Sequence, residues 1–154
     1  MILGDYTVRR IEETHIGQLF RLSKDCLYEK GVENIRDDLL MLGLKNALSK
    51  KMVNVDFGLF KLNSLVGFAF VEIHQIFYLK NPNARLMSIY LHPDHRTEEN
   101  YAKMLDYILN LLNQLEIKIL TTADNWTLCN DCEILDRAMK SFKGSEDKIY
   151  NLER

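Results

Sequence analysis

The sequence predicts an α/β fold with a mixed β-sheet, and three observations support this prediction. An apolar run over 84–91 is followed by Pro93 and then by helical spacing, which indicates a strand, a tight loop and a helix. The segment 116–122 is short and rich in β-branched residues, as a strand parallel to the first would be. Before this unit, 53–61 and 65–75 are joined by a short turn, which indicates an antiparallel hairpin.

The N-terminal third is expected to supply one strand and two helices. Residues 6–11 alternate in polarity as a strand does, and Thr14 is a candidate N-cap for the helix that follows. Gly31 is expected to end that helix. A second helix is expected from about Asn34, with two aspartates in its first turns, which suits the helix dipole.

The C-terminal part completes the expected element order. A last helix is expected over 130–140 and a closing strand over 148–152. The order is then β-α-α-β-β-β-α-β-α-β, with a parallel crossover in the second half. We therefore expect a mixed sheet whose parallel strands lie in the second half, flanked by about four helices.

Composition limits the function classes. The chain has 154 residues, of which 47% are apolar and 27% charged, and its net charge is −2. These values argue against a general role at nucleic acids or membrane surfaces. The N-terminus lacks the pattern of a signal peptide, no apolar run approaches about 18 residues, and three cysteines do not make a disulfide framework. We expect a cytoplasmic protein with one hydrophobic core.

Two motifs carry a resemblance to a known family. The stretch 89–96, Ile-Tyr-Leu-His-Pro-Asp-His-Arg, resembles the strand-end motif of the GNAT superfamily of N-acetyltransferases, which use acetyl-CoA. Near the C-terminus, Asn130, Ile134 and Phe142 keep the spacing of that family's Asn-x-x-x-Ile helix and terminal Gly-Phe. Element order also agrees with the family, so we expect a single GNAT-like domain over 1–154.

The resemblance implies a place for acetyl-CoA. The strands ending at Leu91 and near Thr122 would splay apart around the pantetheine arm, and the backbone N–H of Leu91 would face the thioester carbonyl. The pyrophosphate would meet the N–H groups of the loop 96–101. The residues expected to bind the cofactor are Ile89, Leu91, Arg96, Thr97, Asn100, Tyr101 and Asn130.

The same loop also departs from the family pattern. Thr97, Glu99 and Tyr101 stand where the family usually has glycine or small residues, so their side chains occupy the approach of the phosphates. Glu98 and Glu99 lie in the first turn of the helix, where a carboxylate gains roughly 0.3–1 kcal/mol from the helix dipole and would repel a pyrophosphate. The family's proton-donating tyrosine falls on Arg137, which cannot act as a general acid at neutral pH.

Acyl transfer needs a base for the attacking amine and a proton donor for the leaving thiolate. On the expected topology, Glu72, His74, Tyr90 and Asp124 are the polar groups that could reach the cleft. Each is also explained as an ordinary strand-edge or loop side chain, and that alternative stays open. The catalytic candidates are the Leu91 amide, Tyr90, Glu72 and Asp124.

Two spacings raise the question of a metal. Cys129 and Cys132 form a CxxC and His92 and His95 an HxxH, and both pairs are expected at the same end of the splayed strands. His92 already belongs to the strand-end motif, and one CxxC at a helix start is weak evidence, so we predict no metal. An additional apolar residue on the long helix, Leu109, is compatible with a homodimer contact.

The function expected from these observations is transfer of an acetyl group from acetyl-CoA to a primary amine, by direct attack in a ternary complex. The acceptor would be a small molecule or a peptide. Arg85 and Arg137 would favour an acceptor with a carboxylate if both line the cleft. The alternative is a GNAT-fold protein that has lost cofactor binding and acts as a binding or regulatory module, because fold alone does not fix function.

Overall fold

The computed structural model describes residues 5–49, 54–74, 83–117, 119–122, 143–144 and 149–151. The element order within these ranges agrees with the predicted order, apart from one additional short strand. The strands are β1 (Tyr6–Arg10), β2 (Asn54–Lys61), β3 (Ser64–His74), β4 (Asn83–Leu91), β5 (Ile119–Thr122), β6 (Lys143–Gly144) and β7 (Ile149–Asn151). The helices are α1 (Ile16–Glu29), α2 (Asp37–Ser49) and α3 (Glu98–Gln114), with 3₁₀ turns over Glu13–His15 and Pro93–His95.

The strands form one mixed sheet in the order β1-β2-β3-β4-β5-β7-β6. The first four strands are antiparallel neighbours, β4 and β5 are parallel, and β5 pairs antiparallel with β7. The predicted α/β class and the parallel crossover are therefore confirmed. Three helices lie in the described residues; the helix predicted over 130–140 falls outside them.

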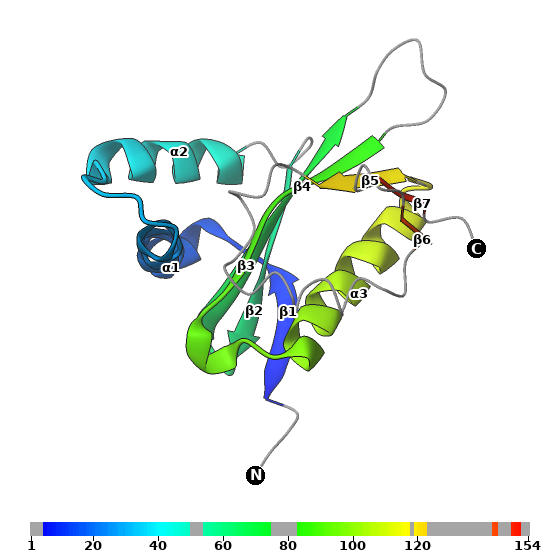
Figure 1. Cartoon of the computed structure of the whole chain (residues 1–154), viewed down its shortest axis with the longest axis horizontal. Coiled ribbons are helices and arrows are strands. Elements are labelled where there is room, and N and C mark those ends of the chain that lie inside the picture. The colour runs from blue at the N-terminus through cyan, green and yellow to red at the C-terminus, as the bar shows by residue number, and fades with distance from the viewer. Residues whose placement is uncertain are drawn as a thin grey trace.

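The helices cover the two faces of the sheet unequally (Figure 1). α1 and α2 lie on one face and α3 lies on the other, where it runs along the sheet from β1 toward β5. The ring of Phe57 in β2 is 5.0 Å from that of Tyr107 in α3. On its sheet-facing side, α3 buries Tyr101, Met104, Leu105, Ile108 and Leu112, which are at most 1% exposed. Apolar residues spaced three and four positions apart are the pattern from which this helix was predicted.

Two helix starts differ from the predictions. Thr14 is not an N-cap: it lies inside the first 3₁₀ turn, which Glu12 caps, and the Glu12 backbone N–H donates to Nδ1 of His15 at 2.9 Å. α2 begins at Asp37 rather than near Asn34, because Asn34 has a φ of 59°, which a right-handed helix cannot contain. The end of α1 is as predicted, since Gly31 follows it with a φ of +81°.

A β-bulge interrupts the pairing of β3 with β4. Phe70 is opposite Ser88 and Val71 is opposite Leu86, so Met87 is an extra residue on β4. β4 pairs with β5 only over Ala84–Leu86, directly before this bulge. Bulges bend a strand and increase its twist. The bulge therefore lies at the point where, among the described residues, β4 continues without β5.

Candidate functional site

The C-terminal end of β4 is fixed to β3 by backbone hydrogen bonds. The N–H of His92 donates to the carbonyl of Val66 at 2.9 Å, and Leu91 is opposite Gly67. In an antiparallel ladder, hydrogen-bonded and non-hydrogen-bonded pairs alternate. The backbone N–H and C=O groups of Ile89 and Leu91 therefore point away from β3, toward the side on which β5 lies.

The carbonyl of Leu91 is held from that side by Arg96. Nε and Nη2 of Arg96 donate to this oxygen at 3.1 and 2.8 Å, and Nη2 also donates to the Glu29 carboxylate at 2.9 Å. The Arg96 side chain is only 6% exposed. Hydrogen bonds with a charged donor are shorter and stronger than neutral ones. The Arg96–Glu29 pair therefore joins α1, the end of β4 and the loop before α3.

The first turn of α3 uses several of its own amide groups. Thr97 is the N-cap, and its hydroxyl accepts from the N–H of Asn100 at 3.1 Å. The N–H of Tyr101 donates to the Thr97 carbonyl, and the N–H of Thr97 donates to the His95 carbonyl, both at 3.1 Å. The Asn100 side chain also donates to the His95 carbonyl at 2.8 Å. Three amides that were expected to meet a pyrophosphate already have acceptors within the chain.

The corner formed by the loop 95–97 and the first turn of α3 carries mixed charge. Glu98 and Glu99 are exposed in the first turn of α3, as predicted from the sequence. Nδ1 of His95 and the Tyr6 hydroxyl share a hydrogen bond of 2.7 Å. Burial lowers the pKa of His95, and the positive charge of nearby Lys61 lowers it further. His95 is therefore neutral at pH 7, Glu98 and Glu99 are negative, and Lys61 and Lys103 supply positive charge on the Tyr6 side.

Comparison with known proteins identifies the architecture. No family model matches the sequence, and no curated protein is significantly similar to it. Solved structures do match. A predicted acetyltransferase with acetyl-CoA from Clostridium acetobutylicum superposes with a TM-score of 0.69 over 92% of each chain at 16% identity. A GNAT family acetyltransferase from Staphylococcus aureus gives 0.65 over 79% of this chain and 87% of that chain, also at 16% identity. The chain has the GNAT fold.

Another neighbour extends the range of acetyltransferases that share this architecture. An aminoglycoside acetyltransferase from an uncultured soil metagenomic sample, solved in complex with sisomicin, superposes with a TM-score of 0.71 over 94% of each chain at 15% identity. Identities this low show the shared GNAT fold. They assign no role to any individual residue of this chain, so such roles depend on the geometry of this chain itself.

The GNAT fold places the predicted catalytic residues in different surroundings. Tyr90 is 1% exposed, and its ring packs against Phe68 at 5.6 Å. Burial, with the Glu29 carboxylate adding to the effect, raises the pKa of Tyr90, so its phenol stays protonated at neutral pH. Glu72 is half-buried, 3.5 Å from Nε2 of His74 and opposite Arg85. Asp124, Asn130 and Arg137 lie outside the described residues.

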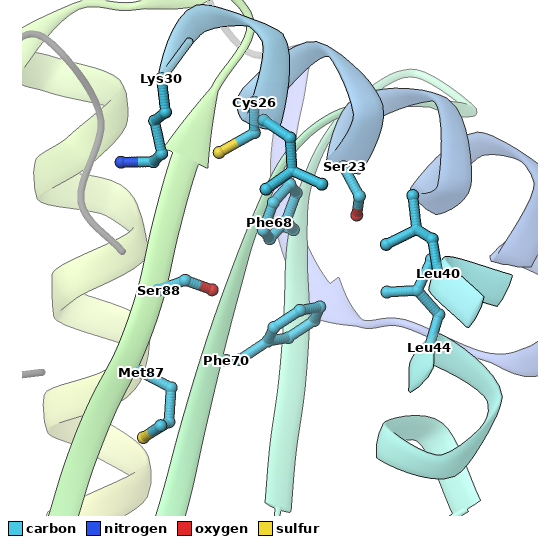
Figure 2. Close-up of a pocket in the computed structure, with 10 residues that line it drawn as sticks. Ser23, Cys26, Lys30, Leu40, Leu44, Phe68, Phe70, Met87 and Ser88 are labelled. Carbon is cyan, nitrogen blue, oxygen red and sulfur yellow. The ribbon is translucent and has the colours of Figure 1, made fainter. Parts of the chain in front are cut away.

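A pocket of about 260 Å³ lies between α1, α2 and the sheet (Figure 2). Its apolar lining includes Leu40 and Leu44 of α2, Phe68 and Phe70 of β3, and Met87 at the β4 bulge. Ser23 of α1, Lys30 directly after α1 and Ser88 of β4 also line the pocket, but the lining surface is almost entirely apolar. Because Met87 and Ser88 directly follow the β4–β5 pairing, the pocket lies beside the point where the two strands part.

A buried carboxyl lies on the same face of the sheet. Asp56 in β2 is opposite Phe70 of β3 and is 5% exposed. Its Oδ1 has no hydrogen-bond partner among the described residues. Burial raises the pKa of Asp56 to about 6, although the positive charge of Arg10 opposes that shift. A carboxyl that titrates near neutrality therefore lies beside the strand that lines the pocket.

Neither a metal cluster nor a membrane span is found in the part of the chain that the structure describes. No group of three or more His, Cys, Asp or Glu side chains there is arranged to hold a metal. Cys129 and Cys132, half of the zinc arrangement considered from the sequence, lie outside the described ranges. No described helix has both the length and the apolar character needed to cross a bilayer.

Sequence reasoning missed Glu29, Asp56 and the residues of the pocket. Glu29 gave no local signal, because its partner Arg96 lies 67 residues further along the chain. Asp56 did give one, since it is a charged residue inside the apolar strand sequence Val-Asp-Phe. A charge within a buried strand is rare enough to single out. The pocket combines two helices and two strands, so no short motif encodes it.

Proposed function

We propose that the chain is an N-acyltransferase that moves an acetyl group from acetyl-CoA to a primary amine by direct attack in a ternary complex. One observation carries the proposal: the N–H of Leu91 points away from β3, at a strand end held by both Val66 and Arg96. Donors that are fixed before the reaction stabilise an oxyanion without reorganising. Ile89, two residues earlier, presents its N–H to the same side.

The fit to acetyl-CoA differs between the two ends of the cofactor. At the strand, the amides of Ile89 and Leu91 suit the pantetheine arm and the thioester carbonyl. At the helix, the amides of Thr97, Asn100 and Tyr101 are already bonded within the chain, and two carboxylates stand beside them. Binding of the pyrophosphate there requires this first turn to rearrange.

The thioester supplies an activated acetyl group, and the chain would position the groups that react with it. The amine nitrogen attacks the thioester carbon, the carbon–sulfur bond breaks, and the amine proton passes to a base while the thiolate leaves. Leu91 N–H would stabilise the negative oxygen during attack. Tyr90, Glu72 and Asp124 stay predicted proton carriers, and Asp56 is a further carboxyl whose pKa of about 6 suits a base.

A second candidate function is favoured by the closed corner at α3. A chain with the GNAT fold whose first-turn amides are internally bonded, and whose loop carries Glu98 and Glu99, can serve as a binding or regulatory module without coenzyme A. Under this alternative, the pocket beside β4 would bind a ligand but no acyl group would be transferred. The cytoplasmic location and the homodimer contact remain sequence predictions under both candidates.

Titration calorimetry with acetyl-CoA tests the proposal. The wild type is compared with a variant carrying Glu98→Gly and Glu99→Gly and with a matched variant carrying Gln at both positions. The Gln pair removes only charge, whereas the Gly pair also removes the side chains. Micromolar binding by the wild type, with release of free thiol when amines are added, supports the enzyme.

The opposite pattern identifies the second candidate. No heat of binding for the wild type, with binding gained in either variant, means that the corner is closed by the two glutamates. Gain in the Gly pair alone would assign the closure to side-chain bulk, and gain in both pairs would assign it to charge. Absence of binding in all three proteins would refute the N-acyltransferase proposal.

A further inference from the structure

The pocket beside β4 suits an apolar ligand. Leu40 and Leu44 of α2 line it from one side, and Phe68 and Phe70 of β3 line it from the sheet (Figure 2). Its volume of about 260 Å³ is room for roughly eight groups of the size of a water molecule, which takes about 30 Å³ in the liquid. Apolar cavities stay dry and bind apolar molecules. The pocket therefore has the size and the lining for a short hydrocarbon chain.

The polar residues of the lining offer little to a charged ligand. The Oγ of Ser23 is fully buried and so cannot be reached from the pocket. Figure 2 shows the Lys30 ammonium directed away from the pocket. The remaining polar residue is Ser88, on the β4 side. An amine or a carboxylate inside the pocket would lose its hydration without gaining a charged partner, which is strongly unfavourable.

The pocket begins beside the place where the thioester is proposed to lie. Met87 and Ser88 line the pocket, and Ile89 follows them directly, with its N–H on the side of β4 that faces away from β3. An acyl group whose carbonyl is bound by the amides of Ile89 and Leu91 would therefore have its chain next to Ser88. Every acceptor carries an amine, whereas an acyl chain has no polar group beyond its carbonyl. Among the reactants, the acyl chain is thus the part that matches the lining.

We infer that the pocket holds the hydrocarbon chain of an acyl group of about six carbons, and that such a thioester is a donor in addition to acetyl-CoA. The carbonyl would stay at the amides of Ile89 and Leu91, and the chain would extend past Ser88 toward Leu40 and Leu44. Transfer of this acyl group rests on the proposed function and breaks and forms the same bonds, whereas binding of the chain does not rest on it. An acetyl group has only a methyl beyond its carbonyl and would leave most of the pocket unfilled.

Titration calorimetry with two matched pairs of thioesters tests the inference. Acetyl-CoA is compared with hexanoyl-CoA, and S-acetyl-pantetheine with S-hexanoyl-pantetheine. The pantetheine thioesters lack the phosphates, so their binding does not require the first turn of α3 to rearrange. Burial of one methylene tightens binding by up to about 4-fold. The four additional methylenes of the hexanoyl group should therefore tighten binding by about 10-fold or more in both pairs, with an upper limit of about 200-fold.

A pair of variants tests the place of the chain. Leu40→Trp fills the pocket and should weaken the hexanoyl thioesters by about 10-fold or more, which removes their advantage over the acetyl thioesters. Leu39→Trp adds the same bulk at a position that is 53% exposed and should preserve that advantage. Thermal unfolding of each variant confirms that it is folded. Met87→Trp, on the β4 side of the pocket, takes the place of Leu40→Trp if that variant does not fold.

The outcomes separate this inference from the proposed function. Equal binding of acetyl and hexanoyl thioesters overturns the inference, and acetyl transfer still stands if acetyl-CoA binds. Preference for S-hexanoyl-pantetheine, with no binding of either coenzyme A thioester, supports the pocket assignment and refutes only the transfer from coenzyme A. A hexanoyl preference that persists in the folded Leu40→Trp or Met87→Trp variant overturns the inference, and so does an absence of binding by all four thioesters.

Discussion

Replacement of Asp56 by asparagine tests whether its buried carboxyl makes stability depend on pH. Asparagine keeps the size of the side chain and cannot ionise. Asp56 is 5% exposed, its Oδ1 has no partner among the described residues, and burial raises its pKa from 3.8 to about 6. The folded state thus binds the proton more tightly than the unfolded state does. The stabilisation that this provides is fully present below about pH 3.8 and is lost as the pH rises through about 6.

The expected size follows from the two pKa values. Ionised Asp56 should cost the wild type about 3 kcal/mol above pH 7, because one pKa unit corresponds to about 1.4 kcal/mol. At pH 5 the cost should be about 1.6 kcal/mol, and at pH 4 about 0.5 kcal/mol. The free energy of unfolding, measured by urea titration from pH 4 to 8, should therefore favour Asp56→Asn increasingly toward high pH.

Only the pH dependence of the difference is diagnostic, since an asparagine at this site adds a constant offset of its own. The matched control is Asp106→Asn, because Asp106 is exposed on α3. Its pH profile should follow that of the wild type. A difference between Asp56→Asn and the wild type that stays constant from pH 4 to 8 would show that this carboxyl is not desolvated, and the reasoning would be wrong.

Three further variants test the strand end and its supports. Arg96→Met should lower the free energy of unfolding in urea by about 2–4 kcal/mol, because the Leu91 carbonyl and the Glu29 carboxylate of α1 lose a charged donor. An unchanged value would contradict the role of Arg96 in holding these two groups. Gly67→Ala should lower the free energy of unfolding by about 1–3 kcal/mol, because the new Cβ would overlap the Leu91 side chain and lie 2.9 Å from a backbone oxygen of β4. Wild-type thermal stability would show that the strands have room to adjust. Tyr6→Phe should cost about 0.5–1.5 kcal/mol at pH 7.5, through loss of the hydrogen bond to His95, and a neutral effect on urea unfolding would exclude that bond in solution.

The elements that the sequence predicted well are those that local patterns encode. The strand 83–91, the helix after it and the hairpin of β2 and β3 appear within one or two residues of their expected bounds, because apolar period and turn residues act over short distances. Helix starts were less predictable, because capping depends on backbone geometry. Thr14 has the chemistry of an N-cap, yet Glu12 and His15 cap each other one turn earlier.

The site was less predictable than the fold, because its key contacts join distant parts of the chain. The sequence predicts a cofactor loop at 96–101, and it gave no sign that the Arg96 guanidinium turns inward to Glu29, 67 residues earlier, and to the Leu91 carbonyl. Ser23 and Leu40 become neighbours of β4 only after α1 and α2 dock on the sheet. Periodicity predicts that such residues face inward, and it does not predict that they leave a pocket.

The inward turn of Arg96 also bears on how acetyl-CoA could bind. A glycine-rich loop leaves its amides available to a phosphate, whereas here Thr97, Asn100 and Tyr101 have already donated theirs. The Tyr101 bond is the first i→i−4 bond of α3 and can stay in place, so the cost is that of releasing the Thr97 and Asn100 bonds. At about 0.5–1.5 kcal/mol each this is about 1–3 kcal/mol, which weakens cofactor binding by roughly 5- to 150-fold. Removing the charges of Glu98 and Glu99 relieves repulsion but leaves that cost in place. Thr97→Gly removes the hydroxyl that accepts from the Asn100 N–H, so this substitution should make that one amide available to a phosphate.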